Sequence, residues 1–194
     1  MKRFAKFFAL TFLPLALLTA CSSSPDTTTS NENKAGPSAN VIYNGAEFSV
    51  SVPKDWEVLE KDQLGSSYTK GLLVAFRNNI KSSTFTSNIN ILESDVPDNM
   101  SLKDFVDANK AGLKQALIQY VETSTKNVDL KGGQKAMLIE FQGKKDATSS
   151  LTNFKQLYTI KGKKAFLLTA SYLATEDAKV VKSLDDTISS FMLK

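Results

Sequence analysis

The residue types that carry most acid–base, nucleophilic and metal chemistry are nearly absent from this chain. Its 194 residues include no histidine and a single cysteine, Cys21. Ser-His, Cys-His and histidine-based metal arrangements are therefore excluded. The sequence also has no Ser-x-x-Lys helix start, Gly-x-Ser-x-Gly elbow or phosphate-binding glycine loop. We therefore expect a protein that is not an enzyme and that holds neither a cofactor nor a metal.

Two acidic pairs and one tryptophan remain as candidates for chemistry. Asp95 and Asp98 could flank a Ca²⁺ ion, but such an ion prefers six or more oxygen ligands and the surrounding loop offers no obvious others. A solvated loop before a helix is the favoured interpretation. Asp185 and Asp186 are neighbours in a predicted helix, so they point apart and do not share one task. Trp56 could be a ligand platform, although core packing is favoured.

The one cysteine stands where covalent modification is expected. Cys21 follows Leu18-Thr19-Ala20, and upstream lie three basic residues and then a mostly apolar run, 7–18. This is the layout of a secretory signal, and at about 12 residues the run is too short to span a bilayer, which takes roughly 20. The motif is similar to the lipobox of bacterial lipoproteins. That resemblance implies that Cys21 receives a diacylglyceryl group and becomes the first residue of the mature chain.

This resemblance implies a location in the cell envelope. Two acyl chains suffice to hold a protein on a membrane, so the membrane itself is the first expected partner. Ser22, directly after the cysteine, is similar to the export-permitting residue of Gram-negative lipoproteins and favours the periplasmic face of the outer membrane. In a Gram-positive cell the expected location is the outer face of the cell membrane.

Composition divides the chain into three parts. Residues 1–20 are the expected signal peptide, and residues 21–40 hold the lipidated cysteine and a polar segment without Leu, Ile, Val or aromatic residues. Such a segment cannot bury enough apolar surface to become ordered, which predicts a disordered tether. Residues 41–194 are enough for one domain with its own core. The net charge of +4 includes the signal's basic residues, so no nucleic-acid partner is expected.

Hydrophobic patterning predicts strands interrupted by one helix and followed by another. The expected strands are 47–52, 56–60, 72–76, 87–93, 122–130, 135–141, 154–160 and 165–173. The first helix is expected to start at Ser101, to continue its apolar stripe to Tyr120 and to approach the sheet closely at Gly112. We expect this helix to lie on a sheet whose other face is wet. The second helix is expected to start at Thr175. Its predicted buried stripe is Val181, Leu184, Ile188, Phe191 and Met192.

The order of these elements predicts an α+β fold with a mostly antiparallel central sheet and two main helices, on opposite faces or on the same face. The phrase Phe48-x-Val50-x-Val52-Pro53-x-x-Trp56, the long first helix, the meander and the closing Ile188-Ser189-Ser190-Phe191 helix resemble the PsbP-like fold. More narrowly, they resemble bacterial lipoproteins of the DcrB-like kind. The resemblance covers Val41 to Lys194. It implies an α/β/α sandwich and a non-enzymatic module that docks onto a larger assembly. We expect this assembly to be an envelope protein partner, and we expect the module itself to be a monomer.

Lysines beside the meander turns form a candidate contact surface. The first and third turns of an antiparallel meander emerge at the same end of the sheet. That end is expected to gather Lys131, Lys135, Lys161, Lys163 and Lys164. These lysines could simply discourage aggregation. Alternatively, they could form a basic tip that recognises an anionic membrane surface or polymer, which is the alternative to docking on a protein.

Overall fold

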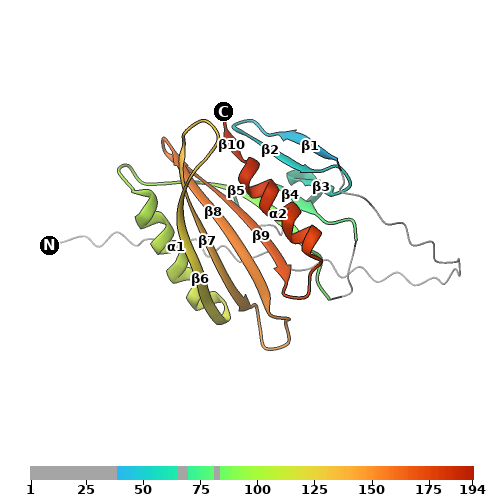
Figure 1. The fold of residues 1–194 in the computed structure, drawn as a ribbon. Coiled ribbons are helices and arrows are strands. Elements are labelled where there is room, and N and C mark those ends of the chain that lie inside the picture. Colours follow the sequence, from blue (N-terminus) through green and yellow to red (C-terminus); the bar gives the residue numbers. More distant parts are fainter. Residues whose placement is uncertain (1–38, 65–69, 81–83) are drawn as a thin grey trace, which may run out of the picture.

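The computed structural model describes residues 39–64, 70–80 and 84–194 (Figure 1). Its helices are α1 (Leu102–Ala116) and α2 (Ala178–Ser190), with a short 3-10 helix at Lys61–Leu64. The strands are β1 (Asn40–Asn44), β2 (Phe48–Pro53), β3 (Glu57–Glu60), β4 (Leu72–Arg77), β5 (Asn88–Asp95), β6 (Ile118–Asp129), β7 (Lys135–Lys144), β8 (Thr152–Lys161), β9 (Lys164–Leu173) and β10 (Met192–Leu193). Neither α-helix of this described part has the length and apolar character needed to cross a membrane.

The strands form two antiparallel sheets. The larger has seven strands in the order β3-β4-β5-β9-β8-β7-β6, and the smaller has three in the order β1-β2-β10. The predicted meander is confirmed, since β6, β7, β8 and β9 pair in sequence. Strand β9 then pairs with β5 on its other side and so joins the meander to the earlier strands. Strands β1 and β10 were not predicted.

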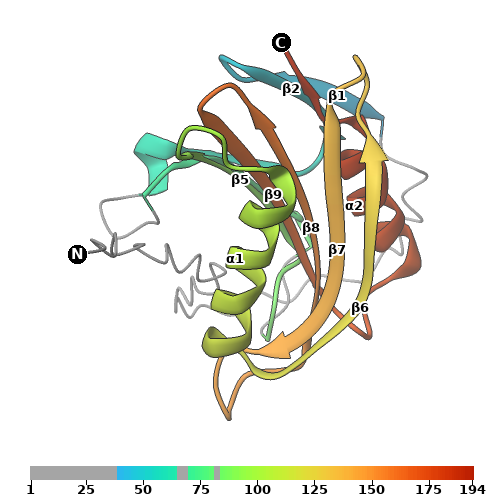
Figure 2. The ribbon, with the colours of Figure 1, turned by 90° about the vertical axis from the view of Figure 1, so that its left-hand side faces the viewer.

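Both faces of the larger sheet are covered, one by each helix. Along β9, the side chains of Phe166 and Leu168 pack in one core cluster with α2, whereas Ala165 and Leu167 pack in a second cluster with α1. Figure 2, viewed from the side of α1, shows this helix in front of the strands and α2 beyond them. The α/β/α sandwich is therefore confirmed, and the expectation of a wet face is wrong because both faces carry buried apolar clusters.

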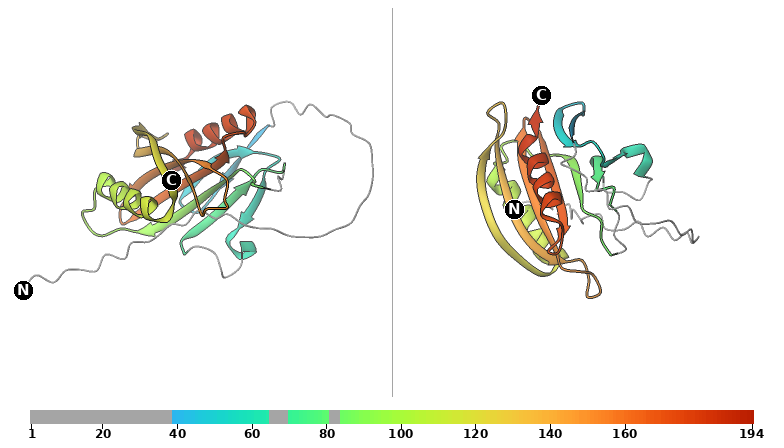
Figure 3. Two further views of the ribbon diagram at one scale, coloured as in Figure 1. Left: turned by 90° about the horizontal axis from the view of Figure 1, so that it is seen from below. Right: turned by 45° about the vertical axis from the view of Figure 1, so that its right-hand side comes forward.

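The smaller sheet completes the cover on the side of α2 (Figure 3, right). As predicted, Phe48, Val50 and Val52 of β2 are all buried. They share a core cluster with Trp56, which is 7% exposed, so the interpretation of Trp56 as a packing residue is confirmed. Because β3 belongs to the larger sheet, the turn after Pro53 carries the chain from one sheet to the other.

Helix α1 begins as predicted and ends early. The Ser101 side chain accepts a hydrogen bond from the Asp104 backbone N–H at 3.1 Å, a typical N-cap. The helix ends at Ala116, and the chain continues into β6, where Gln119, with φ of 56°, lies at a register shift. Tyr120 is consequently a strand residue. The expectation that the helix approaches the sheet closely at Gly112 is also wrong, since a Cβ added there would meet nothing within 4 Å.

Helix α2 begins later than predicted and buries a shorter stripe. Its N-cap is Asp177 in place of Thr175, and the Asp177 carboxylate accepts a hydrogen bond from the Lys179 N–H at 2.7 Å. Leu184, Ile188 and Phe191 are buried as expected. Met192, however, is exposed because it lies in β10, opposite Ser49 of β2. The apolar stripe therefore ends where the chain leaves the helix and joins the smaller sheet.

A buried hydroxyl in α2 yields a test of this packing. Thr187 is fully buried, and in the described part of the chain its Oγ1 has no hydrogen-bond partner. Thr187→Val replaces that hydroxyl with a methyl group of the same shape, so we expect the free energy of unfolding to rise by about 1 kcal/mol. Urea denaturation should show a higher midpoint with an unchanged slope. Thr175→Val, at an exposed position, is the control and should change stability by less than about 0.5 kcal/mol. A midpoint for Thr187→Val at or below that of the wild type would contradict the prediction.

Candidate functional site

The structure brings the lysine residues at the meander turns to one end of the larger sheet. Strand register places Lys135 opposite Asp129 and Lys164 opposite Lys161, and both pairs lie at the same end of the meander. The two turns are also linked directly, because Gln134 Nε2 donates a hydrogen bond to the Ile160 carbonyl at 2.7 Å. The expected grouping of Lys131, Lys135, Lys161, Lys163 and Lys164 is therefore present.

Most of these lysine charges are already paired. The ion pairs are Lys135–Asp129 at 2.6 Å, Lys163–Asp98 at 2.8 Å, and Lys164 with both Glu47 and Glu93 at 2.8 Å. Hydrogen bonds to Glu47 and Glu93 raise the pKa of Lys164. Among the described residues, Lys131 and Lys161 have no ion pair with a carboxylate, although Lys161 donates a hydrogen bond to the carbonyl oxygen of Lys194. Little net positive charge remains here to attract an anionic surface.

The acidic pairs predicted from the sequence have separate partners. Asp98 pairs with Lys163, and no group of three or more His, Cys, Asp or Glu residues that could hold a metal occurs in the described part of the chain. Asp185 contacts Lys155 of β8, whereas Asp186 pairs with Lys182 one turn earlier in α2 at 2.6 Å. Asp185 and Asp186 thus contact different lysines, as expected of neighbouring helix residues that point apart. Cys21 lies outside the described residues.

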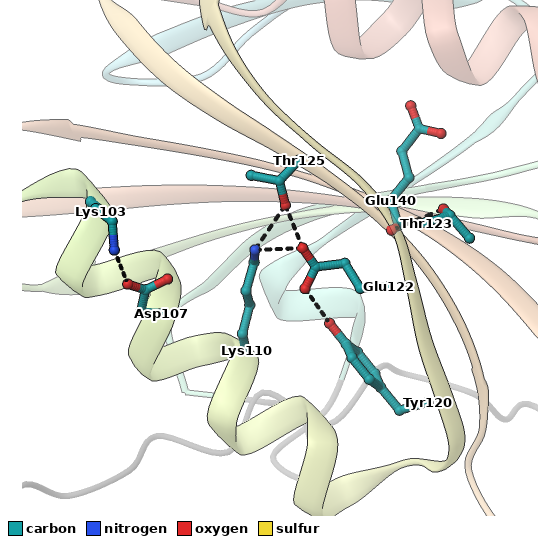
Figure 4. A network of polar contacts seen from close by, with 8 residues as sticks. All are labelled: Lys103, Asp107, Lys110, Tyr120, Glu122, Thr123, Thr125 and Glu140. Atoms are coloured by element: carbon teal, nitrogen blue, oxygen red, sulfur yellow. Dashed lines mark hydrogen bonds and ion pairs between the residues drawn. The ribbon is translucent and has the colours of Figure 1, made fainter.

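A polar network joins α1 to the edge strand β6 (Figure 4). Lys110 Nζ contacts Glu122 Oε1 at 2.7 Å and donates a hydrogen bond to Thr125 Oγ1 at 2.8 Å. Thr125 in turn donates to Glu122 Oε1 at 2.6 Å, and the Tyr120 hydroxyl donates to Glu122 Oε2 at 3.4 Å. Glu122 and Thr125 lie 12 and 15 positions after Lys110 in the chain, and no sequence motif indicated that they contact it.

The environment of this network moves the pKa values of Glu122 and Tyr120 away from neutrality. Burial alone would raise the pKa of Glu122, but hydrogen bonds from Lys110 and Thr125 outweigh it, so the pKa is lowered. Burial, and then the Glu122 carboxylate, raise the pKa of Tyr120 to about 12. Both groups therefore keep a fixed protonation state near pH 7. The arrangement is suited to holding α1 against β6 and poorly suited to exchanging protons.

A second network lies on the opposite face of the sheet. Lys155 of β8 contacts Asp185 of α2, lies 6.0 Å from the centre of the Tyr172 ring, and faces Glu140 across the strand pair. The Lys155 side chain is only 14% exposed. Burial alone would lower the pKa of Lys155, but its hydrogen bond to Asp185 and the nearby Tyr172 and Glu140 raise it. This network ties α2 to the sheet.

Buried polar side chains also line the α1 side of the central strands, where the sequence predicted no special feature. Tyr158 donates a hydrogen bond to Gln156, whose Nε2 donates to Thr169 Oγ1 at 3.0 Å. Nearby, Asn88 Oδ1 accepts from Ser171 at 3.1 Å and from Asn90 at 3.3 Å. Gln156, Thr169, Ser171 and Asn90 are each 5% exposed or less. These side chains mostly satisfy one another, as buried polar groups must.

Comparison with known proteins identifies the fold class. No protein-family model matches the chain, and no curated protein matches it in sequence. Among solved structures it is similar to CyanoP, the cyanobacterial PsbP of Synechocystis sp. PCC 6803, with a TM-score of 0.61 and 19% identity over 85% of this chain and 98% of that one. Together with the two helices packed on antiparallel sheets, this match shows a PsbP-like fold.

Two further solved structures share the fold at still lower identity. LpqN, involved in cell envelope biogenesis of Mycobacterium tuberculosis, has a TM-score of 0.60 and 14% identity over 80% of this chain and 90% of that one. PA94, a Pseudomonas aeruginosa protein of unknown function, has a TM-score of 0.53 and 10% identity over 78% of this chain and 95% of that one. At such identities the likeness concerns the fold alone.

The two neighbouring aspartates of α2 are expected to differ in their effect on stability. Asp185→Ala leaves the largely buried Lys155 without its closest carboxylate, which should lower the free energy of unfolding by roughly 1–2 kcal/mol. Asp186→Ala removes an exposed ion pair and should cost less than about 0.5 kcal/mol. Urea denaturation of the two variants measures the difference directly. Equal midpoints would show that the contact between Lys155 and Asp185 contributes nothing.

The raised pKa of Tyr120 predicts that the protein loses stability at alkaline pH. This raised pKa means that the folded protein holds the phenolic proton more tightly than the unfolded chain does. This contribution is fully present below about pH 10 and is lost as the pH rises through about 12. Tyr120→Phe should therefore lose less stability than the wild type between these two pH values, as measured by urea denaturation. If the free energies of unfolding of the two proteins fell in parallel over this pH range, the alkaline loss of stability could not be assigned to Tyr120.

Proposed function

We propose that this protein is a lipid-anchored binding module of the bacterial cell envelope, of the DcrB-like kind, which docks onto an envelope protein partner and performs no catalysis. The observation that carries this proposal is the sequence around Cys21, where a secretory signal ends in a lipobox-like motif. The signal supports export, and the cysteine supports attachment to an extracytoplasmic membrane surface. The domain that follows would then act at that surface.

The folded domain supports a binding role in two ways. Its strongest polar networks connect one element of the domain to another, as Lys110–Glu122 and Lys155–Asp185 do. Its exposed large apolar side chains, in contrast, include several on edge strands, where another chain could contact them: Ile42, Val41, Val58, Ile118 and Val121. The fold likeness to LpqN, a protein involved in cell envelope biogenesis, is consistent with this setting.

The ion pairs of the lysine residues disfavour the alternative function. Recognition of an anionic surface through Lys131, Lys135, Lys161, Lys163 and Lys164 needs uncompensated positive charge. Carboxylates already accompany Lys135, Lys163 and Lys164. We therefore favour a protein partner over an anionic lipid or polymer.

The anchor is tested by Cys21→Ser. Without the thiol no diacylglyceryl group can be attached, so we expect the variant to leave the membrane fraction when membranes are washed at high salt. Wild-type protein should remain in that fraction, because two acyl chains hold it without help from charge. Ser23→Ala, two residues further along, is the matched control and should behave as the wild type.

Retention of the Cys21→Ser protein in salt-washed membranes would contradict the proposed anchor. Docking is tested separately by crosslinking the wild-type protein in cells. We expect one envelope protein to be enriched with the wild type and reduced with Cys21→Ser. An identical crosslinking pattern for the two proteins would argue against docking at the membrane.

A further inference from the structure

Among the described residues, strand β1 forms a sheet edge without the usual protection against pairing. Its sequence is Asn-Val-Ile-Tyr-Asn, without a charge, a proline or a bulge, and Ile42 is 70% exposed. Natural proteins commonly protect free edges with charged residues, proline, bulges or short length. The edge strand β6 has two register shifts as well as charged residues, and β3 has two glutamates among its four residues. Figure 1 shows β1 at the outer margin of the molecule.

The direction of the β1 backbone follows from its partner strand. Opposite Ile42 lies Ser51 of β2, whose N–H donates to Ser190 Oγ at 2.8 Å and therefore points away from β1. Ile42 and Ser51 are thus a non-hydrogen-bonded pair, and the N–H and C=O of Ile42 face the free edge. The same alternation turns the backbone groups of Asn40 and Asn44 outward, so the edge offers three donors and three acceptors.

A second copy of β1 satisfies this edge completely. When two β1 strands run antiparallel about a two-fold axis at Ile42, Asn40 of one lies opposite Asn44 of the other, and Ile42 lies opposite its own copy. Each outward N–H then meets an outward C=O. A shift of one residue would set outward groups against inward ones, and a shift of two would leave one asparagine of each strand without a partner, so this register makes the most hydrogen bonds.

The side chains are also self-complementary in this register. Ile42 lies on the outer face of the smaller sheet, so the two Ile42 side chains come together across the axis. The asparagine side chains at the two ends can exchange amide hydrogen bonds. Val41 and Tyr43 meet on the inner face, where Tyr43 already packs against Phe48 and Phe76.

We propose that two anchored copies of this protein pair through their β1 edges into one continuous antiparallel sheet. The proposal rests on the proposed function in one respect, because anchoring supplies the local concentration that so short an edge needs. Cys21 precedes Asn40 by a segment that spans at most roughly 65 Å, so both domains stay near one membrane surface. The pairing revises the expectation of a monomer.

Cysteine crosslinking in the full-length lipoprotein tests this pairing. In the proposed register the two Ile42 Cα atoms are about 5.5 Å apart, within the range that a disulfide bridges. We expect Ile42→Cys to form a covalent dimer when isolated membranes are mildly oxidised. Ile80→Cys is the matched control, since Ile80 is 73% exposed but lies in a loop, and it should stay monomeric. Dimers from both variants, or from neither, would overturn the proposal.

Charge substitutions then test the register. In the Ile42→Cys protein, Asn40→Lys with Asn44→Lys sets like charges opposite each other and should abolish the dimer. Asn40→Lys with Asn44→Glu sets opposite charges together and should retain it. Equal dimer yields from the two combinations would overturn the proposed register.

The wild-type protein, in which Cys21 is the only cysteine, separates failure of this inference from failure of the proposed function. A wild-type disulfide dimer would mean that the Cys21 thiol is free, which contradicts the anchor. Membrane-bound Ile42→Cys that stays monomeric contradicts edge pairing alone.

Discussion

Strand β9 must bury apolar side chains on both of its faces, and the rest of the fold depends on that requirement. Phe166, Leu168 and Ala170 face the cluster completed by α2 and β2, while Ala165 and Leu167 face the cluster completed by α1. Burying one large apolar side chain stabilises a fold by roughly 1.5–3 kcal/mol, so either face left open would forfeit several such contributions. Helix α2 contacts β9, and β2 of the smaller sheet packs in the same cluster as buried residues of β4 and β5.

Burial on both faces also determines how the polar residues behave. Gln156 and Thr169 lie in central strands of a covered sheet, where unpaired amides and hydroxyls are costly. They therefore bond to each other and to Tyr158, whose pKa burial raises. The same reasoning applies to Lys155, which keeps its charge under α2 because Asp185 lies beside it. Most polar groups of the interior thus already have partners within the domain.

Within the described residues, several exposed apolar side chains and the outward backbone groups of β1 lie at sheet edges. Ion pairs such as Lys164–Glu47 neutralise much of the lysine-bearing end, so charge gives little basis for recognition there. Free backbone groups accompany exposed apolar side chains at β1, and this combination favours another strand over a charged polymer. These properties support the proposed contact with another protein chain over the alternative of an anionic surface.

The sequence by itself determined the features that depend on local chemistry. Alternation along 165–173 predicted β9, Ser101 predicted the start of α1, and the absence of histidine excluded whole classes of catalysis. Only the tertiary structure decided where α1 ends, why Met192 is exposed, and which carboxylate accompanies each lysine. The reason is physical: Lys164 and Glu47 are 117 positions apart, and β1 is recognisable as a strand only through its pairing with β2. Such pairings arise only when the sheets have assembled, and no local pattern encodes them.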